Sequence, residues 1–339
     1  MFRIGHIGDI TCALPALRAV RRAYPEAHLT LLTSTGRRNS PGARELIEGV
    51  DWIDEIRCYE AGDIATLGGR WGLAMDLRHR RFDVWLNLSA SLSSPLREFR
   101  DMIFARLAGA RWARGWHIDT LHWARQAQSE HLAFPNEVDR VLTIVDRAGF
   151  PAGPVEFALP RTAAAQARVN TLLPAGGATG WVALAPGAKR STNRWPPERF
   201  AEVGAWLAAR GARVVLLGGP VDAEECARIA ATIGPSALSF AGQLTLPESC
   251  EVLRRCRFAI CVDSGVQHLA SAVGTPTISL FSFWQLRGKW HPYGARNVVL
   301  QKWVPCHTCF LDRCPHDNRC MKAIEVDEAI RHAMKKLAA

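Results

Sequence analysis

The residues best suited to bind a ligand follow an apolar run at 258–262, which has the length of a buried strand. Asp263, Ser264 and Gly265 interrupt this run, and apolar residues then recur at helical spacing, which predicts a strand, a tight turn and a helix. The first N–H groups of a helix are unpaired and carry the positive end of its dipole, an arrangement that favours phosphate. His268 lies within the first turn or so and adds a side-chain donor. These four residues are candidate ligands of a phosphate-containing substrate.

A second candidate loop follows the apolar run at 181–185 and is rich in cations and hydroxyl groups. Such a loop wraps a diphosphate through charge-assisted hydrogen bonds. A solvated basic loop is the alternative interpretation. The candidate ligands in this loop are Lys189, Ser191, Thr192 and Arg194.

A third candidate follows the glycine turn at 218–219, where an acidic helix begins. A carboxylate at the start of this helix is suited to hold ribose hydroxyl groups, as acidic residues do in other nucleotide-binding folds. The resemblance described below favours Glu224 for this role, and Asp222 is close enough to compete. The alternative is that these carboxylates only complement the helix dipole.

Asp9 lies where the first short apolar segment turns into the first helix. Ligands of open α/β sheets bind beyond the carboxyl ends of the strands, so this position directs a carboxylate toward a substrate. The alternative is that Asp9 caps the helix. The segment before it is short for a first strand, so either the strand is short or the true start of the protein lies upstream.

Four of the ten cysteines lie within 15 positions. In a reducing compartment this clustering favours a metal site over disulfides, and tetrahedral sulfur suits zinc or iron. His307 and His316 are alternative ligands, and reduced thiols or occasional disulfides are the alternative interpretation. The remaining cysteines are scattered, several of them in apolar periodic segments, and are expected in the core. The clustered residues are Cys306, Cys309, Cys314 and Cys320.

The elements that would position these residues alternate between strand and helix patterns, which predicts an α/β protein built of βα units. The length of 339 residues suits two domains. We expect an N-terminal domain at 1–155, a second α/β domain at 156–325 that includes the Cys-rich element at 306–320, and a C-terminal helix at 326–339. The expected helices include 13–24, 97–108 and 136–148, and the expected strands include 28–33, 83–88 and 181–185.

The formal charge of +10 indicates an acidic partner: nucleic acid, an anionic membrane surface or a phosphorylated substrate. A generally basic protein from a GC-rich genome is the alternative. No run of 18 apolar residues and no signal peptide is present, so we expect a cytoplasmic location. Arginines gather in the first half, where they could receive an anionic acceptor; they are Arg78, Arg80, Arg81, Arg97, Arg100, Arg106, Arg111 and Arg114.

Taken together, these motifs resemble glycosyltransferase family 9, the ADP-heptose heptosyltransferases of lipopolysaccharide core assembly. The matches run in the family's order over nearly the whole chain. They are Gly8-Asp9 with Pro15-Ala16-Leu17, Pro186-Gly187-Ala188 with Arg194-Trp195-Pro196, Gly218-Gly219-Pro220, Asp263-Ser264-Gly265 with His268, and Ala270, Ala272, Gly274, Thr275 and Pro276.

The resemblance implies a GT-B fold, in which two Rossmann-like domains with parallel sheets face each other across a cleft. It implies an inverting transfer that requires no metal, with Asp9 as general base and the loop of Ser264, Gly265 and His268 holding the diphosphate. Where some heptosyltransferases have a lysine two positions before the loop tryptophan, this chain has Asn193, so Lys189 or Arg194 is expected to supply the charge.

The function implied is transfer of heptose from ADP-heptose to a hydroxyl of an anionic lipopolysaccharide inner-core acceptor, with peripheral contact at the inner membrane surface. The cysteine cluster resembles an element of enzymes that heptosylate autotransporter proteins and carry iron there, so a protein acceptor with a structural metal is the alternative. A basic, metal-containing nucleic-acid-binding protein is a remote third reading, opposed by the absence of a recognised nucleic-acid module; no nucleic acid is expected as a partner.

Overall fold

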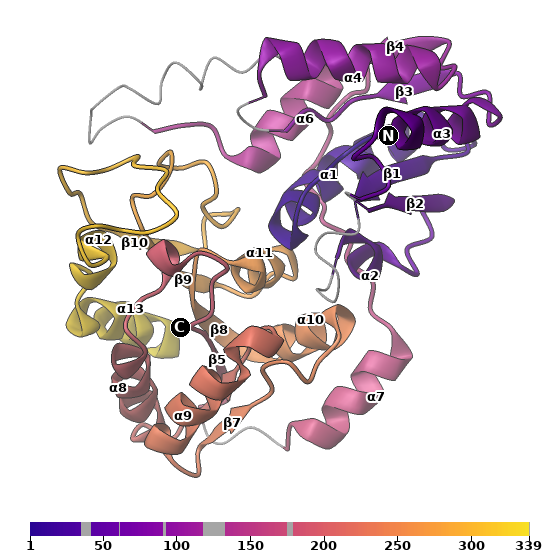
Figure 1. The fold of residues 1–339 in the computed structure, drawn as a ribbon. Helices are drawn as coiled ribbons and strands as arrows, with labels where there is room; N and C mark the ends of the chain where they lie inside the picture. Colours follow the sequence, from indigo (N-terminus) through magenta and orange to yellow (C-terminus); the bar gives the residue numbers. More distant parts are fainter. Residues whose placement is uncertain (35–41, 61, 91–92, 118–132, 175–178, 339) are drawn as a thin grey trace. The chain divides into compact units, whose positions relative to one another are not determined.

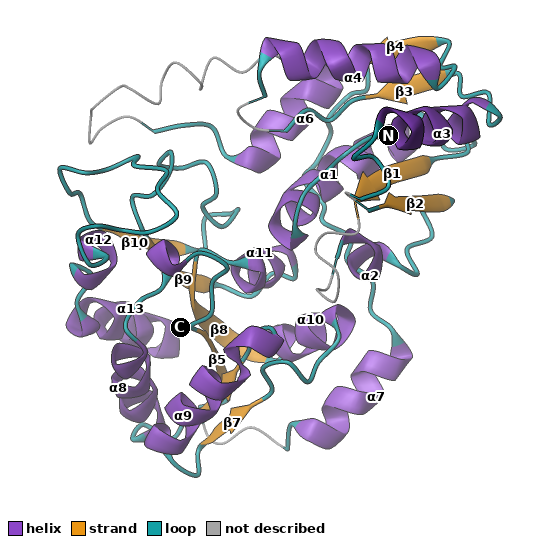
Figure 2. Cartoon of the chain, viewed as in Figure 1, coloured by secondary structure: helices purple, strands orange, loops and turns teal. Residues whose placement is uncertain are grey.

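The computed structural model describes residues 1–34, 42–60, 62–90, 93–117, 133–174 and 179–338. The chain forms two compact units. The first comprises the described parts of Met1–Ala127 and Pro135–Pro160, and the second those of Gln128–Phe134 and Arg161–Ala339. The division that the sequence predicts after residue 155 falls in the connection between α6 (Glu137–Arg147) and α7 (Ala163–Leu172). Figure 2 shows the helices and strands of both units.

Short parallel strands and their covering helices make up the first unit (Figure 1). The strands β1 and β2 pair in parallel, as do β3 and β4, and Phe2 bridges to Leu32 on one side and to Asn87 on the other. Within the described residues, the segment before α1 therefore pairs through this single bridging residue. The remaining elements are α1 (Ile7–Ala23), β1 (Thr30–Ser34), α2 (Ala43–Ile47), β2 (Glu55–Tyr59), α3 (Leu67–Arg78), β3 (Val84–Leu86), α4 (Pro95–Leu107) and β4 (Trp112–Arg114).

The first helix begins earlier than the sequence predicts: it starts at Ile7, not at residue 13. The Asp9 carboxylate accepts a hydrogen bond from the His6 backbone N–H, which satisfies the amide just before the helix. Pro15 lies inside the helix and lacks the N–H that would normally bond to Thr11. The helix nevertheless continues through it, as the predicted helix at 13–24 requires.

The second unit contains a six-stranded sheet in which every pair is parallel and the strand order is β10-β9-β8-β5-β6-β7. The order reverses between β5 and β8, and in open α/β sheets ligands bind at such a switch point. The elements are α7, β5 (Trp181–Ala185), η1 (Ser191–Asn193), α8 (Pro197–Ala208), β6 (Arg213–Leu216), η2 (Pro220–Asp222), α9 (Ala223–Ile233), β7 (Ala237–Ser239), α10 (Leu246–Arg254), β8 (Cys256–Val262), α11 (Gly265–Ala272), β9 (Thr277–Phe281), β10 (Val298–Gln301), α12 (Arg319–Lys322) and α13 (Val326–Ala338).

The two faces of this sheet carry side chains of different size, because successive residues of a strand point to opposite faces. Val182 and Leu184 of β5, with Phe258 and Ile260 of β8, belong to the large core cluster that also contains residues of α8, α9 and α13. The intervening residues are small, Ala183 and Ala185 of β5 and Ala259 and Cys261 of β8, and they are fully or almost fully buried on the other face. The α10 and α11 helices contact β8.

Candidate functional site

The predicted donor-binding residues of the second unit lie in loops that leave the carboxyl ends of β5, β6 and β8. The Asn193 side-chain amide donates to Asp263 Oδ2 over 3.1 Å, and Asn193 Oδ1 accepts from the Ser282 hydroxyl over 2.6 Å. The first bond joins the loop after β5 to the turn after β8, across the switch point of the sheet, and the second joins the same loop to the segment after β9. Loops separated by about 70 positions in the sequence thus meet at one edge.

The turn after β8 leads directly into α11, as the sequence predicts. Ser264 is the N-cap of α11 in extended conformation, and Gly265 is the first helical residue. The Ser264 hydroxyl is buried and, among the described residues, has no hydrogen-bond partner; the same holds for the Thr192 hydroxyl and the Gln267 side-chain amide. A buried polar atom without a partner costs about 1–3 kcal/mol. Such costs are offset when a ligand supplies the missing bonds.

His268 is buried on the first turns of α11, and its ring lies 6.0 Å from that of Trp290 in an edge-on arrangement. Lys289, the neighbour of Trp290, is also buried, with only 1% of its surface exposed. A buried lysine beside the predicted donor site is a functional candidate that the sequence did not indicate. The loop around Lys289 has no regular spacing of apolar residues. The neighbouring Trp290 is the one feature of the sequence that favours burial of this lysine.

The structure gives Arg194 partners within the protein. Its guanidinium donates to Asp222 over 2.6 Å and to Glu225 over 2.9 Å, and its Nε donates to the Ala188 carbonyl. The arginine therefore holds the loop after β5 against the start of α9. Its predicted role as a donor ligand stays a prediction.

Asp222 is engaged in the same interaction, while Glu224 is exposed on the first turn of α9. Asp222 also accepts a hydrogen bond from the Gly219 N–H. A Cβ on Gly187 would lie 2.3–2.5 Å from the Asp222 carboxyl atoms, so only glycine fits there. Of the two competing carboxylates, Glu224 is the more accessible to a ribose. Lys189 and Ser191 of the loop after β5 are exposed as well.

Asp9 lies in the first unit, at the carboxyl end of the segment that contains Phe2. Its Oδ2 caps α1 as described above, so the helix-capping interpretation is correct. Its Oδ1 lies 3.8 Å from the Arg3 guanidinium, and 28% of its side chain is exposed. Capping and chemistry are compatible here, because one oxygen orients the carboxylate while the side chain remains accessible.

A buried ion network, which the sequence analysis did not identify, supports this edge. Arg3 donates to Glu137 Oε1 over 2.8 Å and to the Ser89 carbonyl over 3.0 Å. Glu137 also accepts two bonds from Arg140, and Arg140 donates to the Ser89 carbonyl as well. All three side chains are almost completely buried. Arg3 lies more than 130 positions from Glu137 and Arg140, so the sequence pattern gave no sign of the network.

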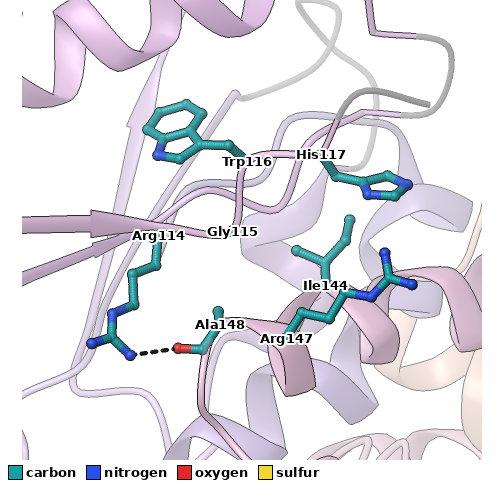
Figure 3. Close-up of a pocket in the computed structure, with 7 residues that line it drawn as sticks. All are labelled: Arg114, Gly115, Trp116, His117, Ile144, Arg147 and Ala148. Carbon is teal, nitrogen blue, oxygen red and sulfur yellow. Dashed lines mark hydrogen bonds between the residues drawn. The ribbon is translucent and has the colours of Figure 1, made fainter.

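A pocket of about 350 Å³ opens beside β4 and α6 in the first unit (Figure 3). Arg114, Trp116 and His117 line it from β4 and the segment that follows, and Ile144 and Arg147 line it from α6. The Arg114 guanidinium donates to the Ala148 carbonyl over 2.8 Å, as drawn in Figure 3. Two arginines, a histidine and an indole suit an anionic, hydroxyl-bearing ligand.

The Cys-rich element contacts the loop after β5. The Asn318 side-chain amide donates to the Ser191 carbonyl over 2.7 Å, and the Trp284 indole N–H donates to the Leu311 carbonyl over 2.8 Å. The Arg190 guanidinium pairs with Asp312 and lies 4.0 Å from the centre of the Trp284 ring. The element therefore stabilises the loop that carries Lys189 to Arg194.

The four clustered cysteines are half-buried and carry no disulfide. Burial raises the pKa of the Cys320 thiol, and the nearby Cys314 and Cys306 raise it further. As placed, however, no group of three or more His, Cys, Asp or Glu side chains in the described ranges is arranged to hold a metal ion. The four thiols are therefore not arranged as a metal site in this structure.

Comparison with known proteins assigns the family. The profile described as "Glycosyltransferase family 9 (heptosyltransferase)" matches residues 70–319, well over half of the chain. The chain belongs to glycosyltransferase family 9. It is therefore a glycosyltransferase, and the family resemblance found in the sequence is confirmed.

Individual relatives agree with this assignment. Lipopolysaccharide heptosyltransferase 3 of Escherichia coli is 25% identical over 306 residues, which cover 88% of this chain and 86% of that protein. Among solved structures, a glycosyl transferase family 9 protein from Veillonella parvula has a TM-score of 0.77 at 19% identity, covering 99% of this chain and 96% of that one.

The ADP-heptose lps heptosyltransferase II of E. coli gives a TM-score of 0.71 at 19% identity, with coverage of 99% and 98%. These structural likenesses confirm the predicted GT-B fold class.

Proposed function

We propose that this glycosyltransferase moves heptose from ADP-heptose to a hydroxyl of a lipopolysaccharide inner-core acceptor, with inversion at the anomeric carbon. The family assignment supports heptose as the transferred sugar. The relatives named as lipopolysaccharide heptosyltransferases support lipopolysaccharide as the acceptor class. The observation that carries the donor site is the pair of buried hydroxyl groups that have no hydrogen-bond partner among the described residues: Ser264 at the start of α11 and Thr192 in the loop after β5.

The donor is bound by the second unit in this proposal. The Ser264 hydroxyl, the Gly265 N–H and His268 donate to the diphosphate, while Lys189, Ser191 and Thr192 approach it from the loop after β5. Asp263 fixes that loop through its bond with Asn193. Glu224 accepts from the ribose hydroxyls, and Arg194 acts through Asp222 and Glu225 or directly on the phosphate.

Asp9 acts as the general base. Its carboxylate takes the proton of the acceptor hydroxyl while the hydroxyl oxygen forms a bond to the anomeric carbon of heptose. The bond between that carbon and the β-phosphate oxygen breaks, and its electron pair leaves with ADP. The donors around α11 neutralise the charge that develops on the departing diphosphate. The N–H of His6, bonded to Oδ2, keeps the carboxylate oriented.

The acceptor is bound by the first unit, where the Arg114–Arg147 pocket offers cations to an anionic core. We further propose a cytoplasmic location with contact at the inner face of the membrane. Among the described residues, no helix is long and apolar enough to cross a bilayer. No metal is required for catalysis in this scheme, and a structural zinc or iron at the cluster of Cys306, Cys309, Cys314 and Cys320 stays a prediction, to be tested by metal analysis.

The test measures ADP release from ADP-heptose with truncated core lipid as acceptor. We expect Ser264→Ala to weaken ADP binding about tenfold or more, because it removes a hydrogen bond to a charged group. Ser249→Ala on α10 is the matched control. Absence of acceptor-dependent ADP release by the wild-type protein would refute the proposal.

The second candidate function is transfer of heptose to a Ser or Thr of an autotransporter protein, and the cysteine cluster is the feature that favours it. Mass spectrometry of an acceptor protein co-expressed with this chain separates the two. A mass increase of one heptose on the protein, without transfer to the core lipid, would favour the alternative.

A further inference from the structure

The α4 helix presents apolar side chains to solvent, on the side opposite the sheet. Leu96 and Phe99 have exposed fractions of 82% and 61%, and Ile103 and Leu107 are exposed as well. The spacing of 3, 4 and 4 residues places all four on one side of the helix. The buried side is formed by Ala105 and by the Glu98 carboxylate, which accepts hydrogen bonds from Asn87 and Ser89. This pattern is the reverse of an ordinary surface helix.

The exposed apolar side of α4 adjoins a pocket at the edge strand beside it. Met102 of α4 and Ala113 of β4 line this pocket, whose volume is about 250 Å³. Trp116 lines both this pocket and the Arg114–Arg147 pocket of Figure 3. We define the α4 surface as Leu96, Phe99, Met102, Ile103 and Leu107.

Positive charge borders the α4 surface. Arg97, Arg106 and Arg111 are exposed, and within the ranges that the structure describes no carboxylate forms a salt bridge with any of them. Arg100, also exposed, pairs with Asp101. A second copy of the chain docked face to face would bring these arginines against one another. An anionic partner is favoured instead, and it must also accept large apolar side chains.

We propose that the α4 surface docks on an anionic lipid bilayer, with α4 lying in the plane of the interface. Apolar side chains of such a helix enter the boundary between headgroups and acyl chains, while arginines reach the phosphates and tryptophan prefers the headgroup level. The continuity through Trp116 leads from the docked surface to the pocket assigned to the acceptor. The inference rests on the proposed function for this last step, since a lipid-anchored glycan would reach the pocket from the same membrane.

Vesicle co-sedimentation of the full-length protein tests the docking. We expect binding to vesicles of phosphatidylglycerol and phosphatidylethanolamine and weaker binding to phosphatidylcholine. The double variant Phe99→Glu, Ile103→Glu is expected to lower the partition coefficient at least about tenfold. Met334→Glu, at an exposed methionine of α13, is the matched control and should change it less than about twofold. Arg106→Gln and Arg111→Gln should each cost about fivefold.

The outcomes separate docking from catalysis. Equal binding of the double variant and the wild type, or no binding of either, would overturn the docking proposal, and so would a change from dimer to monomer in sedimentation velocity without an effect on vesicle binding. The double variant should still release ADP with a delipidated, water-soluble core oligosaccharide at the wild-type rate. Loss of ADP release by the wild-type protein would instead refute the proposed function and leave the vesicle result standing.

Discussion

Replacing Glu137 by alanine tests the ion network at the edge of the first unit. The Arg3 and Glu137 side chains are fully buried, and that of Arg140 is almost so. The carboxylate accepts from Arg3 over 2.8 Å and from Arg140 over 2.8 and 2.7 Å, so it compensates two positive charges. Without it, both guanidinium groups remain in the interior, where each still donates to the Ser89 carbonyl and Arg3 keeps the Asp9 carboxylate at 3.8 Å.

The expected loss of stability follows from the cost of an uncompensated buried charge. Removing one partner of a buried ion pair destabilises a protein by about 3–5 kcal/mol. The control is Glu156→Ala in the same unit. Glu156 is about half exposed and pairs with Arg18 and Arg22 at 3.7 and 3.6 Å, so its removal should cost about 0–1 kcal/mol.

Hydrogen exchange of the α6 amides, followed by mass spectrometry, measures this loss within the unit that carries the network. A change of about 3 kcal/mol corresponds to exchange about a hundredfold faster in Glu137→Ala. The Glu156→Ala protein should exchange within about fivefold of the wild type. If the two variants exchange equally, the network does not stabilise this edge and the reasoning is wrong.

Two further predictions concern titratable groups of the second unit. Burial lowers the pKa of His291 to about 4, so as the pH falls the unfolded chain binds a proton at this residue before the folded chain does. The stability that the neutral imidazole contributes is therefore complete above pH 6.5 and is lost as the pH falls toward 4. Between pH 7 and 5 the free energy of unfolding of the wild type should fall by about 2 kcal/mol more than that of His291→Gln, as measured by thermal unfolding, and an equal pH dependence of the two proteins would contradict this. Burial also raises the pKa of Cys226, Cys250 and Cys261 to about 12 and that of Cys256 still further. Native protein at pH 7.5 should therefore be alkylated at the half-buried Cys306, Cys309 and Cys314 well before these four, and early modification of Cys256 would count against the buried core.

Much of the fold follows from the periodicity of the sequence. The strand at 181–185 and the helices at 137–147 and 326–338 lie within one residue of their predicted bounds, because their apolar spacing and terminal signals agree. Short elements such as β2, β7 and β10 were not predicted. Their strands have only three to five residues, and their burial depends on partners distant in the sequence.

The residues predicted to bind the nucleotide sugar lie at one edge of the sheet, because the carboxyl ends of parallel strands share that edge. The order of the motifs along the sequence is enough to predict this placement. Side-chain pairing could not be predicted in the same way. The sequence predicts Arg194 as a free cation of a ligand-binding loop, yet its guanidinium donates to Asp222 and Glu225, which lie 28 and 31 positions further along the chain. Lys289 shows the converse, since a charged residue in a loop gives no sign of burial until the tertiary structure forms.

The most direct test of the central claim is the turnover rate of Asp9→Asn with ADP-heptose and truncated core lipid. The asparagine side-chain oxygen can still accept from the His6 N–H, so α1 keeps its cap while the base is lost. We predict that kcat falls by about 10²–10⁴-fold, the usual contribution of a general base, while the Kd for ADP, which we propose is bound by the other unit, stays unchanged. Turnover within about threefold of the wild type would contradict the assignment of Asp9 as the base.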